Sequence, residues 1–128
     1  MERTEALAIA AGGVVGATVR WAVGAVLDPA TGWPWATFAV NLIGCALLGA
    51  VVGLVSGRPH ARGRIAWQGF VGVGVCGGLT TFSAFAVEVA ELVRDERVVL
   101  GAGYVVASLA LGVLAAAGAR AATAPGAR

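Results

Sequence analysis

The sequence predicts an all-α integral membrane protein with four transmembrane helices. Hydrophobic residues make up 59% of its 128 residues and charged residues only 12%, whereas soluble domains carry about 25% charged residues. Four apolar segments are long enough to cross the hydrocarbon core of a bilayer, and short polar or proline-containing breaks separate them. We therefore expect a single four-helix domain over residues 1–128, embedded in the lipid bilayer.

The first two spans are expected at about residues 5–27 and 35–55. A proline directly after Asp28 ends the first, because proline cannot continue a helix. A turn containing Trp33 and Trp35 opens the second span, and tryptophan favours the interface between membrane and water.

The third and fourth spans are expected at about residues 65–93 and 98–122, joined by the short charged connection RDER. Small residues recur at four-residue spacing, as in Gly49 with Gly53. Such spacing lets helix backbones pack closely in lipid, so packing accounts for most of the twenty glycines.

The third span contains residues that a plain membrane helix does not need. Gly77 and Gly78 each weaken a helix by about 1 kcal/mol relative to alanine, and the hydroxyls of Thr80, Thr81 and Ser83 need partners where no water competes. We expect the helix to break near Gly77 to Thr81. A break at membrane depth frees backbone carbonyls, which is tolerated where they face protein, an ion or a water-filled path.

Two polar stripes accompany this segment. Thr37 and Asn41 lie one helical turn apart on the second span, and Tyr104 and Ser108 lie one turn apart on the fourth. Packing alone could explain Asn41. Side-chain donors that converge without a buried acid would instead favour an anion path.

Four further residues leave alternatives open. Arg20 costs about 3 kcal/mol inside a membrane helix, so it either lines a vestibule for anions or reaches the headgroups. Phe82 and Phe85 are either packing residues or present their positive ring edges to a small anion. The role of Glu88, inside the third span, is open.

The arginines predict the orientation of the chain. The net charge of +2 is too weak and scattered for nucleic-acid binding. With four spans, six arginines fall on the side of both termini and two on the other, so the positive-inside rule predicts cytoplasmic termini. The six are Arg3, Arg58, Arg62, Arg64, Arg120 and Arg128, and the two are Arg94 and Arg97.

Three motifs carry a resemblance to a known family. They are GGVVGATVRW at residues 12–21, TFAVNLIGCALLG at residues 37–49 and GVCGGLTTFSAFAVE at residues 74–88. With these motifs in this order on successive spans, the chain resembles the small fluoride channels of the CrcB/Fluc family. The third motif is the most specific of them.

The resemblance implies a passive fluoride channel of the plasma (inner) membrane that lets cytoplasmic fluoride leave the cell. It implies an antiparallel dimer with pores at the interface and a structural sodium ion at the dimer centre, held by the carbonyls of Gly77 and Thr80. The residues that it implies for the fluoride pathway are Asn41, Phe82, Ser83, Phe85, Tyr104 and Ser108, with Arg20, Thr37, Thr81 and Glu88 in the vestibule or as polar support.

The partner subunit is left open by the sequence. Ala84 and Gly112 stand where the resemblance leads us to expect hydroxyls, and a homodimer with two orientations needs nearly balanced arginines. The observed six against two favours one orientation. The chain is therefore expected to pair with itself or with a related subunit of opposite orientation.

Three other classes of protein fit the sequence less well. A four-helix multidrug or cation exporter would need a membrane-embedded glutamate in the first helix, and no acid lies between Glu5 and Asp28. A non-conducting scaffold would leave the TTFSAF segment and the polar stripes without a purpose. An enzyme would need a nucleophile with a base, or a metal cluster, and the sequence predicts neither.

Overall fold

All regular elements in the described part of the chain are helices. The computed structural model describes residues 3–27, 32–56 and 62–126, without the side chains of residues 62–64. Four helical stretches are long and apolar enough to cross a membrane, which confirms the predicted four-span membrane protein. The elements are α1 (Arg3–Val26), α2 (Trp35–Val55), α3 (Arg62–Gln68), η2 (Gly69–Val75), α4 (Cys76–Leu79), α5 (Phe82–Arg94) and α6 (Val98–Thr123).

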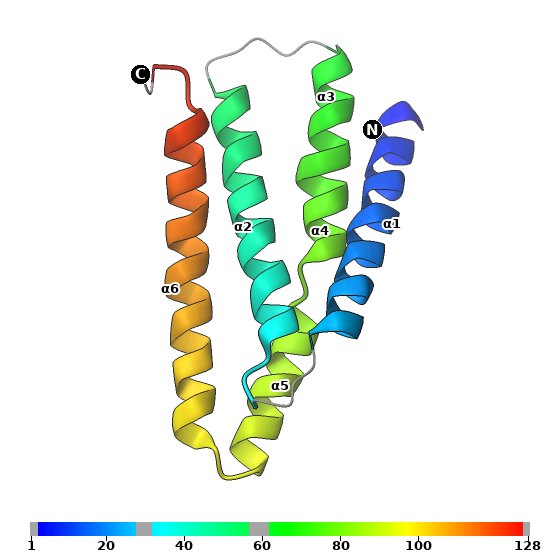
Figure 1. Cartoon of the computed structure of the whole chain (residues 1–128). Coiled ribbons are helices and arrows are strands. Elements are labelled where there is room, and N and C mark those ends of the chain that lie inside the picture. Colours follow the sequence, from blue (N-terminus) through cyan, green and yellow to red (C-terminus); the bar gives the residue numbers. More distant parts are fainter. Residues whose placement is uncertain (1–2, 28–31, 57–61, 127–128) are drawn as a thin grey trace.

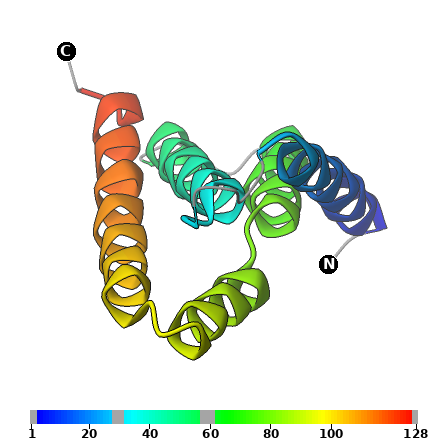
Figure 2. The same ribbon diagram turned by 60° about the horizontal axis from the view of Figure 1, so that its bottom comes forward.

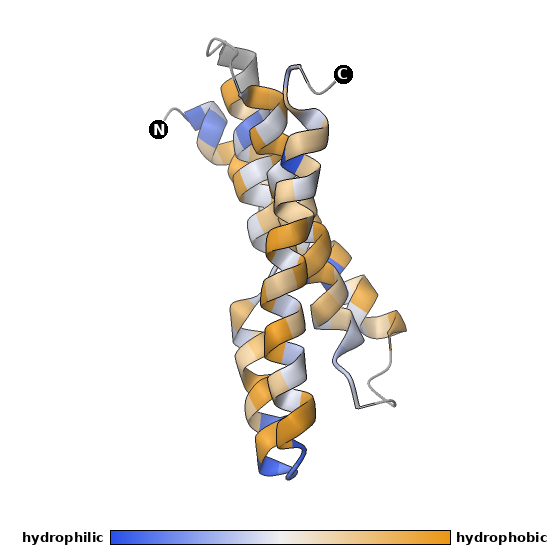
Figure 3. Cartoon of the chain, turned by 90° about the vertical axis from the view of Figure 1, so that its left-hand side faces the viewer, coloured by the Kyte–Doolittle hydropathy of each residue, from blue (hydrophilic) through white to orange (hydrophobic). Residues whose placement is uncertain are grey.

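The spans stand side by side in the order α6, α2, α3 to α4, and α1 (Figure 1). Helix α1 begins and α6 ends at the same end of the bundle, and the turn from α5 into α6 forms the other end. With that other end turned forward, α5 lies to one side of the row formed by the remaining helices (Figure 2). Hydrophilic residues gather toward both ends, with mostly apolar residues between them, as a membrane-spanning bundle requires (Figure 3).

Glycines bring α1 into backbone contact with η2 and α4. A Cβ atom added at Gly12 would collide with the carbonyl oxygen of Phe70, and one at Gly78 would collide with that of Gly13. Close packing over small residues is a main source of helix association in lipid. The glycines of this pair of helices therefore act in packing, as their spacing predicts.

Close packing over glycines also joins α2 to α6. A Cβ atom at Gly49 would collide with the carbonyl of Ala116, and one at Gly53 with the hydroxyl of Thr123. That hydroxyl also donates to the carbonyl oxygen of Ala50 at 3.1 Å. Helices α2 and α6 are thus held by close backbone approach and a hydrogen bond between them.

The break in the third span lies where the sequence predicts it, but the expected cause needs correction. Gly77 and Gly78 are both helical, within α4. The extended residues are Thr80, with φ −79° and ψ 154°, and Thr81, with φ −148° and ψ 120°. Gly78 serves the contact with α1, whereas a Cβ atom at Gly77 would meet nothing within 4 Å. The two threonines therefore form the break.

The π-helical stretch η2 was not predicted. At its end the N–H of Cys76 bonds to the carbonyl of Val71, five residues earlier. Single π-turns inside α-helices often accompany functional sites. Here only the four residues of α4 separate η2 from the break.

Candidate functional site

The side-chain amide of Asn41 on α2 closes the break. The N–H of Thr81 donates to Asn41 Oδ1 at 2.8 Å, and Asn41 Nδ2 donates to the carbonyl oxygen of Thr81 at 3.1 Å. An unsatisfied backbone group in the membrane interior costs several kcal/mol, by order of magnitude. One side chain thus compensates both backbone groups of the extended residue.

Thr81 also starts the next helix. Its hydroxyl accepts a hydrogen bond from the N–H of Ala84 at 3.2 Å, the usual bond of an N-terminal cap. The same hydroxyl lies 3.2 Å from the hydroxyl of Ser83. On the other side of the break, Thr80 Oγ1 donates back to the carbonyl of Cys76 at 2.9 Å.

These bonds divert two N–H groups from their helical partners. In a continuous α-helix the N–H of Thr81 would bond to the carbonyl of Gly77, and the N–H of Ala84 to the carbonyl of Thr80. Both are instead directed to side chains. The carbonyl oxygens of Gly77 and Thr80 lose these bonds, and carbonyl oxygens freed at a broken membrane helix are suitable ligands for a cation such as sodium.

A groove of about 610 Å³ opens beside the break, between α2, η2, α4, α5 and α6. It brings together many of the residues singled out from the sequence. The ring of Phe82 is 80% exposed, while Ser108 Oγ is buried and has no hydrogen-bond partner in the described part of the chain. The predicted residues that line the groove are Asn41, Gly77, Thr80, Thr81, Phe82, Phe85 and Ser108.

Glu88 joins the two polar stripes. Thr37 Oγ1 donates to Glu88 Oε1 at 2.6 Å, and the hydroxyl of Tyr104 donates to Glu88 Oε2 at 2.8 Å. Tyr104 is completely buried. The expectation that the stripes offer donors without a buried acid is therefore wrong for Thr37 and Tyr104, because both hydroxyls are bound to a half-buried carboxyl group.

Aromatic rings continue from the groove to the start of α2. The centroids of Phe82 and Phe85 are 5.9 Å apart, those of Phe85 and Tyr104 5.1 Å, and those of Tyr104 and Trp33 5.4 Å. Phe38 lies against Trp33 and Tyr104. The sequence places Trp33 at the membrane interface and gives no sign of a role for Phe38. Both rings contact Tyr104, which lies 66 or more positions away in the chain, so no local pattern could reveal the contact.

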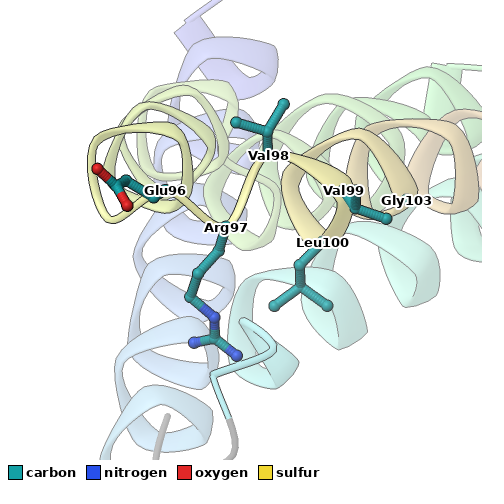
Figure 4. A pocket seen from close by; sticks show the side chains of 6 residues that line it. All are labelled: Glu96, Arg97, Val98, Val99, Leu100 and Gly103. Carbon is teal, nitrogen blue, oxygen red and sulfur yellow. The ribbon is translucent and has the colours of Figure 1, made fainter.

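Two hollows lie toward the α5–α6 end. The first, of about 480 Å³, is lined by Thr37 and Glu88 together with Glu91, Asp95 and Arg97, among other residues. The second, of about 430 Å³, is a shallow and largely apolar depression beside the start of α6 (Figure 4). The side chain of Arg97 extends from it toward the segment that precedes α2 (Figure 4).

Arg20 and Ser83 line neither the groove nor the hollow beside Glu88. Helix α1, which carries Arg20, packs against Gly74 and Gly78 of the third span, whereas Gly77 of that span faces the groove. Arg20 therefore lies on a helix at the opposite side of the broken span. Ser83 is exposed and contacts the Thr81 hydroxyl.

The chain matches the family model described as CrcB-like protein, Camphor Resistance (CrcB), over residues 7–119. The chain belongs to this family. The matched range contains the residues that form the break and the groove, and Glu88 with its two bonding partners.

Several curated relatives are similar to this chain over most of their length. A fluoride-specific ion channel FluC 2 of Rhodococcus jostii is 44% identical over 110 residues, covering 86% of this chain and 90% of the relative. A FluC 1 of Mycolicibacterium paratuberculosis is 40% identical, with 87% and 83% covered, and a FluC of Bordetella bronchiseptica is 42% identical, with 81% and 79% covered.

Proposed function

We propose that this chain is a subunit of a passive, fluoride-selective channel through which cytoplasmic fluoride leaves the cell. The observation that carries the proposal is the groove, where the rings of Phe82 and Phe85 meet the amide of Asn41 and the unpartnered hydroxyl of Ser108. Membership of the CrcB-like family and the names of its relatives support the same function. We propose no enzymatic activity.

The groove suits the physical chemistry of fluoride. A channel must replace the ion's hydration shell with groups that bind it well enough to enter and weakly enough to leave. Hydroxyl and amide donors and the positive edges of phenyl rings meet that requirement. A phenyl ring can face a small anion without placing a basic group beside it. In this assignment Asn41 and Ser108 supply polar groups within the groove. Ser83 would act beside the path, and Arg20 would attract anions from a vestibule of the assembled dimer.

The hydroxyl of Tyr104 takes part through its bond to Glu88, which also holds Thr37. Thr37 and Glu88, which line the hollow, would form the polar end of the path, and the buried Tyr104 would hold Glu88 from behind. Thr81 supports the path indirectly, since its hydroxyl caps α5 and so orients Phe82 and Phe85.

A structural sodium ion fits the carbonyl oxygens of Gly77 and Thr80. Both oxygens lose a helical N–H partner at the break, and no Cβ atom shields Gly77. Sodium would supply a fixed positive charge that holds the broken backbone. No group of three or more metal-binding side chains is found among the described residues, so the proposed ligands are backbone oxygens.

The channel is proposed to be an antiparallel dimer, with the groove of each subunit closed by its partner. Both termini would lie in the cytoplasm and the chain in the plasma (inner) membrane. Arg3 and Arg120 lie at the terminal end of the bundle and Arg94 and Arg97 toward the other. Arg58 and Arg128, and the side chains of Arg62 and Arg64, fall outside the described residues. The arginine excess favours a related partner subunit of opposite orientation over a second copy.

Efflux from liposomes tests the function. The chain is reconstituted alone and with a related subunit in sodium-containing buffer, and fluoride and chloride efflux are measured separately. We expect fluoride efflux far above chloride efflux. Chloride efflux as fast as fluoride efflux would refute the selectivity. A stable dimer of this chain alone that conducts fluoride would refute the related-partner hypothesis while leaving the channel function intact.

A further inference from the structure

Tyr104 is enclosed by aromatic rings from two directions. Phe85 of α5 lies on one side, with ring centroids 5.1 Å apart and planes inclined by 48°. Trp33, just before α2, meets Tyr104 edge to face at 5.4 Å and 77°. Phe38 completes the enclosure at 6.4 Å. The position of the Tyr104 ring is therefore set jointly by the start of α2 and by the proposed fluoride path.

The short segment around the start of α2 contacts both α6 and the middle of α5. Trp33 packs against Tyr104, and Thr37, one turn further on, donates to Glu88. Tyr104 donates to the other oxygen of the same carboxyl group. A shift of the Trp33 ring would therefore change both the Tyr104 hydroxyl bond and the contact of Tyr104 with Phe85.

We propose that Trp33 is a positioning residue for fluoride selectivity, acting through the Tyr104 ring on Phe85. This inference rests on the proposed fluoride channel. The ring of Trp33 acts as a fixed wall: it keeps Tyr104 on Glu88 and keeps the ring edge of Phe85 at the groove. Misplacement of a positioned group by about 1 Å can cost as much as a hundredfold in rate.

The ring, and not the indole N–H, carries this role. Trp33 Nε1 is buried and has no hydrogen-bond partner in the described part of the chain. An edge-to-face aromatic contact contributes about 0.5–1.5 kcal/mol beyond the area that it buries. A phenyl ring in the same place would keep that contact and would avoid a buried donor without a partner.

Trp35 provides a matched control. It belongs to the same segment and contacts Trp33 and Phe38 at 5.9 and 6.2 Å, but its ring is 48% exposed and no ring contact with Tyr104 is found. Trp35 also lines the hollow beside Glu88, but replacing it leaves in place all three rings that contact Tyr104.

The test compares Trp33→Leu, Trp33→Phe and Trp35→Leu in liposomes, with the partner subunit that the wild type requires. We expect Trp33→Leu to lower the ratio of fluoride to chloride flux by about tenfold, Trp33→Phe to stay within about threefold of wild type and Trp35→Leu to leave the ratio unchanged. A wild-type ratio in Trp33→Leu, an equal loss in Trp35→Leu, or an equal loss in Trp33→Phe would each overturn the proposal.

A second measurement does not depend on conduction. Tyr104 is the only tyrosine of the chain, so labelling with 3-fluorotyrosine gives a single ¹⁹F resonance from its ring. Trp33→Leu should shift or broaden this resonance, and Trp35→Leu should not. If the wild type failed to conduct fluoride, the proposed function would fall, while this signal would still decide whether Trp33 positions Tyr104. If Trp33→Leu did not fold, Trp33→Phe would carry the flux test, since loss of selectivity there overturns the role of the ring.

Discussion

The amide group of Asn41 bonds to both the N–H and the carbonyl group of Thr81, so a side chain on α2 completes the backbone of a helix break on the third span. The bond lengths of 3.1 and 2.8 Å are those of ordinary hydrogen bonds. The break and α2 therefore form one structural unit.

Replacement of Asn41 should damage folding and conduction together. In Asn41→Leu both backbone groups of Thr81 lose their partner, and each unsatisfied group costs about 1–3 kcal/mol. We expect a lower melting temperature in detergent and loss of fluoride efflux. Thr18→Val is the matched control, because the exposed Thr18 hydroxyl donates within α1 to the carbonyl of Val14 and, in the described part of the chain, joins no other helix. Wild-type stability in Asn41→Leu would contradict the bonding described.

The phenylalanines give a test of the ring-edge mechanism. Phe82→Ile or Phe85→Ile keeps an apolar side chain but removes the positive ring edge, so fluoride efflux should be abolished or strongly slowed. Phe70→Ile is the control, since Phe70 lies in η2 and is not among the residues that line the groove. If both groove variants conducted like the control, the rings would be packing residues.

The bonds of Glu88 predict non-additive effects. A hydrogen bond contributes about 0.5–1.5 kcal/mol, so Thr37→Val and Tyr104→Phe should each lower the free energy of unfolding. Both hydroxyls act on the same carboxyl group. In a Glu88→Ala background the two substitutions should therefore cost much less. Unfolding of the single, double and triple variants in detergent measures this, and full additivity would exclude coupling through Glu88.

Sodium should stabilise the protein. A ligand that binds only the folded state raises its stability by RT ln(1 + [L]/Kd). We expect the melting temperature to rise with sodium concentration, and the rise to be smaller with N-methylglucamine at equal ionic strength. Identical melting curves with both cations would contradict the sodium site.

The sequence predicts those parts of this protein that depend on local composition. The apolar lengths predict four spans, and the cluster of Gly77, Gly78, Thr80 and Thr81 predicts the region of the break. Within this cluster the glycines stay helical and the threonines are extended, which helix propensity does not predict because it does not include the amide that Asn41 supplies from another span. Gly78 stays helical, and its missing side chain allows the close contact of the third span with α1.

The paired polar groups could not be predicted for the same reason. Thr37 and Glu88 are 51 positions apart, and Tyr104 is 16 positions from Glu88 on a different helix. Periodicity shows which face of a helix a residue occupies, but not which other helix meets that face. The sequence therefore shows the two stripes, but not that the carboxyl group of Glu88 joins them.

The end of α5 gives a prediction that is independent of fluoride. The N–H of Arg97 bonds to the carbonyl of Leu92 at 2.8 Å, and the N–H of Glu96 bonds to that of Val93 at 3.1 Å. This is the Schellman arrangement, in which the residue after the cap adopts a left-handed conformation and is most often glycine. Glu96 occupies that position with φ 60°. A left-handed conformation costs a residue with a side chain about 1–2 kcal/mol.

Glu96→Gly should therefore raise the melting temperature of the protein, by an amount equivalent to about 1 kcal/mol after the greater freedom of glycine in the unfolded chain is subtracted. Glu96→Ala is the control for loss of the carboxylate, since alanine keeps the Cβ atom and the strain. We expect Glu96→Ala to be close to wild type and both variants to retain fluoride efflux. Equal stabilisation by alanine and glycine would show that charge, and not backbone conformation, governs this turn.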